Sequence, residues 1–523
     1  MNDSVFKPIT CGQTLPQNNI HAVSVSMPKL QDVIDYEEQT PQILEKIKSA
    51  YPRFVMHPYL KILAQHIKVK YQVPDYFEVV LLSSKKAVDV VAHKYYIYNK
   101  IPYFDENINE PFGVILVRKN SRQLKKVLQF IQHVGYNLSS RLAEDYLFDI
   151  GLLDSKQDEN LYEKNDAKDV VINSLAKAYN QPSSNVSLAP SGMNAVYSAI
   201  KGAKSIGAKN GRTIIIQLGW LYLDTMNIVD HYYERIKKFL DVKNLNILEE
   251  YLQTHGFQVS SIITEIPTNP RVEVPVLQDL REALNKPRTT PAGNAAIAPV
   301  FIIDQTFCPN VQFLKPKGIF EGIKTLAYVS GSKFPSGGKC TAGYCVSNDE
   351  AKDLMTTIEK HLILCDNGAT PLQINILAQQ MPSMLTRIEA AYRNTREFVS
   401  FIQAELPNAK INFVSDQLAA TGFTPSVFSL DLPARGNTPE DRELHKRELN
   451  HRLIDMMITG IPDESKYCVS YGQLKGCYWT IPATSTQGTT KEGDKDYIAR
   501  VSVSPDLDLE KHKEVFKEFV NCF

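Results

Sequence analysis

The segment from residue 328 to residue 344 reads Tyr328-Val-Ser-Gly-Ser-Lys-Phe-Pro-Ser-Gly-Gly-Lys-Cys-Thr-Ala-Gly-Tyr344. The apolar run 326–329 predicts a buried strand, the Gly- and Ser-rich centre predicts a loop, and residues 342–346 predict a returning strand. Lys333 therefore follows the end of a strand. A lysine in a desolvated site can give up its proton and condense with an aldehyde. We expect Ser330 and Ser332 to hold a phosphate attached to that aldehyde.

The same loop allows two other interpretations. An isolated S-x-S-K is often a surface loop, because short motifs recur by chance. Gly337-Gly-Lys339 suggests a phosphate-binding P-loop, but that motif needs a glycine four residues before its Gly-Lys and a Ser or Thr after it. Here Cys340 follows the lysine and Lys333 occupies the position of the first glycine, so a P-loop is excluded.

Composition restricts the class of protein. The chain has 523 residues, of which 43% are apolar, which predicts two or three domains with large cores. The 58 basic and 58 acidic residues balance, so we expect neither a nucleic-acid partner nor a membrane partner. No signal-peptide pattern, membrane-spanning run or C-x-x-C pair is visible in the sequence. We expect a cytoplasmic protein with small-molecule partners and no metal site.

The pattern along the chain predicts four regions. Residues 1–65 form a polar arm that contacts a neighbouring subunit, and residues 66–165 form an inserted α/β block of unknown role. Residues 166–395 form the cofactor-binding domain, and residues 396–523 form a smaller C-terminal domain. In the third region, helical patterns alternate with short apolar runs such as 299–304, which predicts an α/β fold with a mainly parallel sheet. The pattern also predicts helical stretches over 121–134 and 373–399. Ligands of such sheets bind beyond the carboxyl ends of the strands.

Pyridoxal phosphate needs a lysine for its aldehyde, donors for its phosphate, a carboxylate for its ring nitrogen and a ring to stack on it. Asp304 follows the apolar run 300–303 and suits the ring nitrogen. Ser191-Gly-Met193 opens a helix whose first N–H groups suit the phosphate. We expect Asn269 to form a hydrogen bond with the phenolic oxygen of the cofactor and the ring of Tyr222 to stack on the cofactor ring. Taken singly, these residues also fit ordinary caps, turns and core positions.

Five motifs in this order resemble the pyridoxal-phosphate enzymes of cysteine and methionine metabolism, and the sequence looks closest to the longer cystathionine gamma-synthases of fungi. The motifs are Ser191-Gly-Met193, Tyr222-Leu-Asp-Thr225, Glu265-Ile-Pro-Thr-Asn-Pro270, Asp304-Gln-Thr-Phe307 and Ser330-Gly-Ser-Lys333. The N-terminal segment 21–29, Tyr51-Pro-Arg-Phe54 and Ser139-Ser-Arg-Leu-Ala-Glu144 give the likeness to the fungal proteins.

This resemblance implies a type I, aminotransferase-like fold with a seven-stranded central sheet, and a homotetramer built as a dimer of dimers. It implies that Lys333 and Tyr222 are catalytic and that Thr306 joins the cofactor contacts. Tyr51 and Arg53 look like the family's Y-x-R, which binds the cofactor phosphate of a neighbouring subunit. Arg500 looks like the arginine that clamps the substrate carboxylate, a bidentate task suited to guanidinium, and Ser470 would add a contact.

The leading functional expectation is γ-replacement on an O-acylated homoserine, with cysteine as the incoming thiol and cystathionine as the product. A cystathionine or methionine gamma-lyase, an O-acetylhomoserine sulfhydrylase and replacement by a carbon nucleophile are related alternatives. A pseudo-enzyme that binds a partner through the inserted block is the alternative from another class.

The sequence also departs from the family pattern. The two glycines of the family's Y-G-G-T are replaced here by Leu223 and Asp224, and the glycine after R-x-S-V is replaced by Ser504. These departures bear on reaction specificity more than on cofactor binding.

Overall fold

The computed structural model describes residues 10–15, 17–27, 30–37, 40–47, 55–97, 110–269, 271–364, 368–468, 470–481 and 498–522. Tyr51 and Arg53, which the sequence analysis assigned to the cofactor phosphate, lie outside these residues.

A seven-stranded sheet forms the centre of the molecule, with the strand order β5-β11-β10-β9-β8-β6-β7. Neighbouring strands run parallel except that β11 is antiparallel to both β10 and β5. The strands are β5 (Val186–Ala189), β6 (Ile214–Leu218), β7 (Ile236–Phe239), β8 (Val259–Glu265), β9 (Val300–Asp304), β10 (Thr325–Ser330) and β11 (Gly343–Ser347). The central strands are buried on both faces, which explains why they read as continuous apolar runs.

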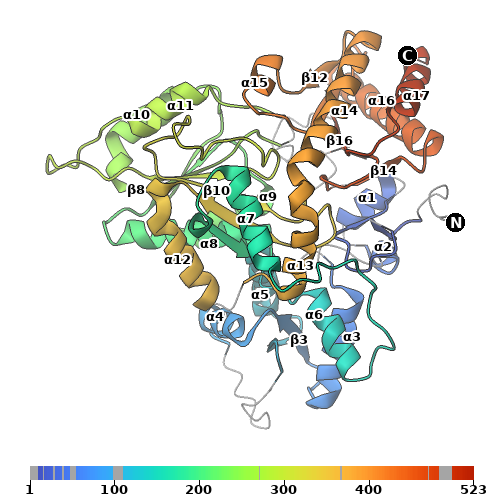
Figure 1. Ribbon diagram of the computed structural model, residues 1–523. Helices are drawn as coiled ribbons and strands as arrows, with labels where there is room; N and C mark the ends of the chain where they lie inside the picture. Colours follow the sequence, from blue (N-terminus) through green and yellow to red (C-terminus); the bar gives the residue numbers. More distant parts are fainter. Residues whose placement is uncertain are drawn as a thin grey trace.

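Helices cover both faces of this sheet (Figure 1). Side chains alternate along β9, so that Val300 and Ile302 enter one core and Phe301 and Ile303 enter the other. The first core contains α8 (Gly192–Ala208), α9 (Leu223–Tyr232) and α12 (Lys352–Leu364). The second contains α7 (Ala167–Tyr179), α10 (Asn246–His255), α11 (Leu277–Asn285) and α13 (Pro371–Gln380). The result is a three-layer α/β domain.

The inserted block adds a small α/β unit beneath this domain (Figure 1). Its elements are α3 (Pro58–Lys70), β3 (Phe77–Leu82), α4 (Lys85–Tyr95), β4 (Gly113–Arg118), α5 (Arg122–Val134) and α6 (Ser140–Asp149). β3 and β4 pair antiparallel. Phe130 and Ile131 of α5 belong to the same core as α8 and α9, so the block is packed against the central domain.

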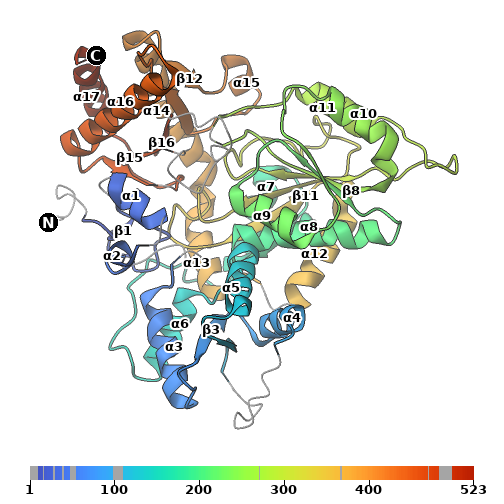
Figure 2. The same cartoon turned by 180° about the vertical axis from the view of Figure 1, so that it is seen from behind.

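The N-terminal arm lies between the inserted block and the C-terminal domain (Figure 2). It contains β1 (Thr14–Leu15), β2 (Ser24–Val25), α1 (Leu30–Glu37) and α2 (Pro41–Leu44). Val25, Met27 and Ile43 share a hydrophobic core with Phe398 and Trp479 of the C-terminal domain. This part of the arm therefore packs on its own chain.

The C-terminal domain has a five-stranded sheet in the order β12-β13-β16-β15-β14. Its strands are β12 (Lys410–Asn412), β13 (Val427–Asp431), β14 (Ser465–Tyr467), β15 (Cys477–Thr480) and β16 (Ala499–Val503). Its helices are α14 (Met384–Glu405), α15 (Asp416–Ala420), α16 (Pro439–Gly460) and α17 (Leu509–Asn521). The side chain of Arg500, on β16, is buried.

The predicted boundaries at 65/66 and 395/396 both fall inside helices, α3 and α14. The long helix α14 is continuous from the central domain into the C-terminal domain, which explains why no change in composition marks that boundary. Within the described ranges, no helix is long and apolar enough to cross a membrane.

Candidate active site

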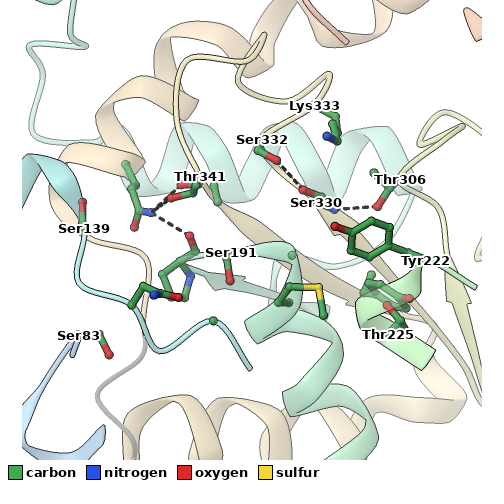
Figure 3. Close-up of a pocket in the computed structure, with 18 of the residues that line it drawn as sticks. Ser83, Ser139, Ser191, Tyr222, Thr225, Thr306, Ser330, Ser332, Lys333 and Thr341 are labelled. Carbon is green, nitrogen blue, oxygen red and sulfur yellow. Dashed lines mark hydrogen bonds between the residues drawn. The ribbon is translucent and has the colours of Figure 1, made fainter. Parts of the chain in front are cut away.

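A cavity opens beyond the carboxyl ends of β8, β9 and β10 and reaches across to the inserted block (Figure 3). Parallel strands place the residues that follow them at one edge of the sheet, which is where ligands of such folds bind. Among its lining residues are Ser83, Asn137, Ser139, Ser191, Gly192, Met193, Tyr222, Glu265, Asn269, Asp304, Thr306, Ser330, Ser332, Lys333, Gln373 and Tyr471.

Lys333 lies in the loop that follows β10, and its side chain is buried. Its Nζ donates a hydrogen bond to Ser470 Oγ at 2.7 Å and lies 5.0 Å from the ring centroid of Tyr471. Gly472 brings this second loop onto the lysine: it has φ +81°, and a Cβ there would lie 2.7 Å from the carbonyl carbon of Lys333. The lysine is thus held between two loops from distant parts of the chain.

The amino-terminal end of α8 forms a cradle of donors. Ser191 caps the helix through its Oγ, which accepts from the N–H of Asn194 at 3.1 Å. Gly192 lets the helix approach β10, since a Cβ on it would lie 2.8 Å from Cβ of Ser330. The hydroxyls of Ser330 and Ser332 are 2.7 Å apart. Backbone N–H groups and hydroxyls beside a helix N-terminus suit a phosphate.

Two carboxylates lie at the opposite end of the cavity. Asp304 and Glu265 are register partners at the ends of β9 and β8, and both are buried. Burial raises the pKa of both carboxyls, and the charge of Asp304 raises the pKa of Glu265 further. Asp304 accepts a hydrogen bond from the N–H of Thr306 at 2.8 Å, which favours its charged form. Of the two carboxyl groups, Asp304 is therefore the better candidate for the ionised one and Glu265 for the protonated one.

Thr306 and Tyr222 lie between these two ends. Thr306 Oγ1 accepts from the N–H of Ser330 at 2.9 Å, which fixes the loop after β9 to the end of β10. Tyr222 occupies the N-cap position of α9, and its ring faces the space between Thr306 and Ser330 (Figure 3). A planar ligand in this space would stack on that ring.

Arg500, on β16 of the C-terminal domain, contacts two residues that line the cavity, Asn269 and Tyr471. Its Nη1 donates to Asn269 Oδ1 at 3.3 Å, and its guanidinium carbon lies 5.8 Å from the ring centroid of Tyr471. Burial lowers the pKa of Arg500. Asn269, which was expected to meet the cofactor, thus also contacts the arginine expected to meet the substrate.

The structure brings nearly all the predicted site residues together. Ten of them line the cavity: Ser191, Gly192, Met193, Tyr222, Asn269, Asp304, Thr306, Ser330, Ser332 and Lys333. Ser470 and Arg500 contact two of these, Lys333 and Asn269. Tyr51 and Arg53 lie outside the described part of the chain.

Several lining residues were missed by the sequence analysis. Glu265 was part of a quoted motif but received no role, and Tyr471 follows Ser470 directly. Gln373 donates to the carbonyls of Pro190 and Thr341, which closes the wall of the cavity. Ser83, Asn137 and Ser139 come from the inserted block, where no motif pointed to chemistry.

Two curated proteins are similar to parts of the chain. An L-2-amino-4-chloropent-4-enoate dechlorinase/desaturase of Streptantibioticus cattleyicolor is 32% identical over 299 residues, which are 55% of this chain and 57% of that protein. A cystathionine gamma-synthase of Saccharomyces cerevisiae is 26% identical over 160 residues, 28% of this chain and 25% of that protein. The match therefore spans little more than half of the first relative and a quarter of the second. No protein-family model matches the chain.

Solved structures show the fold. MetB of Corynebacterium glutamicum superposes with a TM-score of 0.51 at 16% identity, over 68% of this chain and 86% of that one. A cystathionine gamma-lyase of Micromonospora echinospora superposes with a TM-score of 0.52 at 15% identity, over 68% and 87%.

The fold is that of the pyridoxal-phosphate enzymes of transsulfuration, which confirms the predicted fold class. The chain is similar in sequence to enzymes of the cystathionine gamma-synthase type, which confirms the resemblance drawn from its motifs.

Enzymes of this family use pyridoxal 5'-phosphate, the cofactor predicted from the sequence. The donor set in the cavity fits it: a buried lysine, a cradle of N–H and hydroxyl groups, an aromatic ring and a buried carboxylate. The described residues contain no cluster of side chains that would hold a metal ion.

Proposed function

We propose that the protein catalyses γ-replacement on an O-acylated homoserine, with cysteine as the incoming thiol and cystathionine as the product. The observation that carries the proposal is the convergence of Lys333, Asp304, Tyr222 and the α8 cradle on one cavity. Bound pyridoxal phosphate supplies an electron sink for the pair released when the substrate Cα–H bond breaks. Asp304 would hold the ring nitrogen of the cofactor and so strengthen that sink.

Lys333 is the proposed proton carrier. Its free amine would remove the proton from the substrate α-carbon and then take up a proton from the β-carbon. Ser470 Oγ lies 2.7 Å from Nζ and orients the amine. Tyr222 stacks on the cofactor and assists the transfer of protons.

Arg500 is the proposed anchor for the substrate α-carboxylate. Its guanidinium is buried, so a carboxylate there would be bound in a medium with little water, where a bidentate pair is strong. Asn269 and Tyr471 limit the movement of the guanidinium. The anchored substrate would present its α- and β-hydrogens to Lys333.

A second candidate is elimination without replacement. The dechlorinase/desaturase relative is named for a substrate that loses a chloride at carbon 4, the position that carries the leaving group in an O-acylated homoserine. If water enters where a thiol is required, the same cavity would support a lyase that releases 2-oxobutanoate.

The test is product analysis by mass spectrometry. Purified protein receives O-acetylhomoserine or O-succinylhomoserine, each with and without cysteine, and Lys333→Ala serves as the blank. Cystathionine that requires both cysteine and Lys333 supports the proposal, whereas 2-oxobutanoate alone supports the lyase. No product from either donor, in a protein that also shows no lysine-dependent cofactor absorbance, supports a non-catalytic binding module.

We also propose a cytoplasmic homotetramer in which Arg53 reaches the cofactor phosphate of a neighbouring subunit. Arg53→Ala should then weaken cofactor binding, measured by absorbance titration of the cofactor-free protein. Unchanged affinity would exclude this cross-subunit contact, and sedimentation analysis would give the oligomeric state independently.

A further inference from the structure

The inserted block forms one wall of the cavity. Ser83 follows β3, and Asn137 and Ser139 lie between α5 and α6, yet all three line the same space as Ser191 and Lys333. Figure 3 shows Ser83 and Ser139 on the side of the cavity where α8 begins, away from Tyr222. The block therefore meets the cavity at the end where α8 begins and where the phosphate is expected.

The wall is fixed to the cradle by direct contacts. Gly135 has φ +76°, and a Cβ on it would lie 2.3 Å from Ser191 Oγ, so the loop rests on the cap of α8. Asn194 Nδ2 donates to the carbonyl of Val134 at 3.3 Å. The N–H of Ser83 donates to the carbonyl of Tyr136 at 3.0 Å. These contacts hold the segment after α5 in one position.

Two polar groups of this wall lack the partners expected of them. Ser139 is the N-cap residue of the ten-residue helix α6, but its side chain makes no capping hydrogen bond. Asn137 Oδ1 is buried and has no hydrogen-bond partner among the described residues. An amide can be turned over to present its N–H₂ group instead. Both residues line the cavity.

The neutral donors of this wall matter for binding a phosphate because the cavity has few positive charges among its described lining residues. Lys333 is the only cationic side chain among the described residues that line it, and Lys333 is needed at the aldehyde. Within one chain, the described lining residues can therefore stabilise a phosphoryl dianion only through neutral donors and helix termini. The amino-terminal end of α6, marked by Ser139, lies beside the same cavity as the amino-terminal end of α8.

We propose that the first turn of α6, with Ser139 and Asn137, forms the second half of the phosphoryl site and completes the α8 cradle from within the same chain. This inference rests on the proposed function, since it assigns the phosphoryl group to pyridoxal phosphate. It gives the inserted block a role in cofactor binding that does not need a neighbouring subunit.

The test compares two ligands that differ only in the phosphoryl group. Full-length cofactor-free protein is titrated with pyridoxal phosphate and with pyridoxal, and binding is followed by absorbance. The variants are Ser139→Ala and Asn137→Asp, each checked for folding by thermal unfolding. Ser121→Ala is the matched control, because Ser121 belongs to the same block but caps α5, accepting from the N–H of Leu124 at 3.0 Å.

Loss of one hydrogen bond to the phosphoryl group should raise the Kd of pyridoxal phosphate about tenfold in Ser139→Ala, and the added charge should raise it more in Asn137→Asp. The Kd of pyridoxal should stay unchanged, and inorganic phosphate should compete with the cofactor less well in both variants.

Equal affinity of all four proteins for pyridoxal phosphate would overturn the inference, and so would an equal loss of affinity for both ligands. A raised KM for a substrate with unchanged cofactor affinity would also overturn it, because the wall would then face the substrate. If the wild-type protein binds neither ligand, the proposed function itself fails.

Discussion

Glu265 and Asp304 lie opposite each other on β8 and β9, and burial raises the pKa of both carboxyl groups. Two buried carboxylates this close cannot both ionise without a large cost. Glu265 also accepts a hydrogen bond from the backbone of Tyr222. Glu265 thereby links the stacking tyrosine to Asp304, and a proton on Glu265 leaves Asp304 free to hold the charge.

Glu265→Gln should remove the free-energy cost of ionising two buried carboxyl groups side by side. A carboxyl whose pKa is raised by folding contributes stability below its ordinary pKa of 4.5, and that contribution is lost as the pH rises through the folded value. Relative to the wild type, the free energy of unfolding of the cofactor-free variant should therefore rise by on the order of 1–2 kcal/mol as the pH rises above 4.5. Thermal unfolding measures it, with exposed Glu250→Gln as the control; a gain that does not grow with pH contradicts the assignment.

Gly472 packs against the loop that carries Lys333. With φ +81° and a Cβ position 2.6 Å from the N atom of Phe334, any side chain would push the lysine loop away. Gly472→Ala should lower the free energy of unfolding by about 1–3 kcal/mol and weaken cofactor binding. Gly422→Ala is the control, since Gly422 has φ +102° but open space around it. Equal cofactor affinity in the two variants would show that the contact does not position Lys333.

The sequence predicted the polar side chains that follow strands of the parallel sheet. Lys333, Asp304 and Asn269 each come after an apolar run, and the sheet brings the ends of these strands to one place. Ser139 and Asn137 could not be predicted this way. They reach the cavity because a separate block docks on α8, and docking between distant elements leaves no periodic pattern in the sequence.

At the scale of elements, Asp224 explains one departure from the family motif. The family has a glycine there, but here the buried Asp224 on α9 lies 3.8 Å from Nε2 of His133 on α5. His133 Nδ1 also lies 2.9 Å from the hydroxyl of Tyr232. The aspartate is therefore part of the contact that holds the inserted block, and the change of residue accompanies the change of architecture.

Asp224→Ala should loosen that contact. Loss of a buried polar partner costs roughly 1–3 kcal/mol, so the amide hydrogens of α5 should exchange about tenfold faster or more, as measured by hydrogen–deuterium exchange. Asp230→Ala is the control on the same helix, because Asp230 forms a surface pair with Lys238 at 2.8 Å and such pairs contribute little. Equal exchange of α5 in the two variants would mean that packing alone holds the block.

Helices and strands were predicted well where their burial is uniform, and less well where a turn interrupts a helical pattern. The apolar run predicted over 299–304 is β9 (Val300–Asp304), and the helix predicted over 121–134 is α5 with Ser121 as its cap. The single helical stretch predicted over 373–399 is instead α13 and α14, separated by a 3₁₀ turn over Met381–Ser383. Pro382 in that turn is the signal that was passed over.

At the scale of the whole molecule, a buried network joins the arm, the inserted block and the lysine loop. Arg141 on α6 donates twice to Glu159, at 2.6 Å for both bonds, and once to the carbonyl of Lys339 at 2.9 Å. His21 of the arm lies 2.9 Å from a carboxylate oxygen of Glu144, also on α6. The loop that carries Lys333 is thus tied to both N-terminal regions.

Glu159→Gln should weaken this network. Burial acts to raise the pKa of Glu159, but the hydrogen bond and charge of Arg141 outweigh it and hold the pKa below its ordinary value of 4.5. The ion pair therefore stabilises the fold above that value, and the contribution is lost as the pH falls through the lower folded pKa.

At pH 7 the variant should lose about 3 kcal/mol of unfolding free energy, and the difference should shrink as the pH falls below 4.5 toward the lower folded pKa. Asp145→Asn is the control and should cost less than about 1 kcal/mol, because Asp145 lies on α6, as Arg141 does, but forms only an exposed pair with Lys156. A loss at pH 7 no larger than that of the control would contradict the network.

The central claim is that Lys333 carries the cofactor. The most direct measurement is borohydride reduction of the cofactor-loaded protein, followed by digestion and mass spectrometry of the peptides. We expect a pyridoxyl group on Lys333 and none on Lys339, which lies in the same loop. A label on Lys339, on another lysine or on no lysine would contradict it.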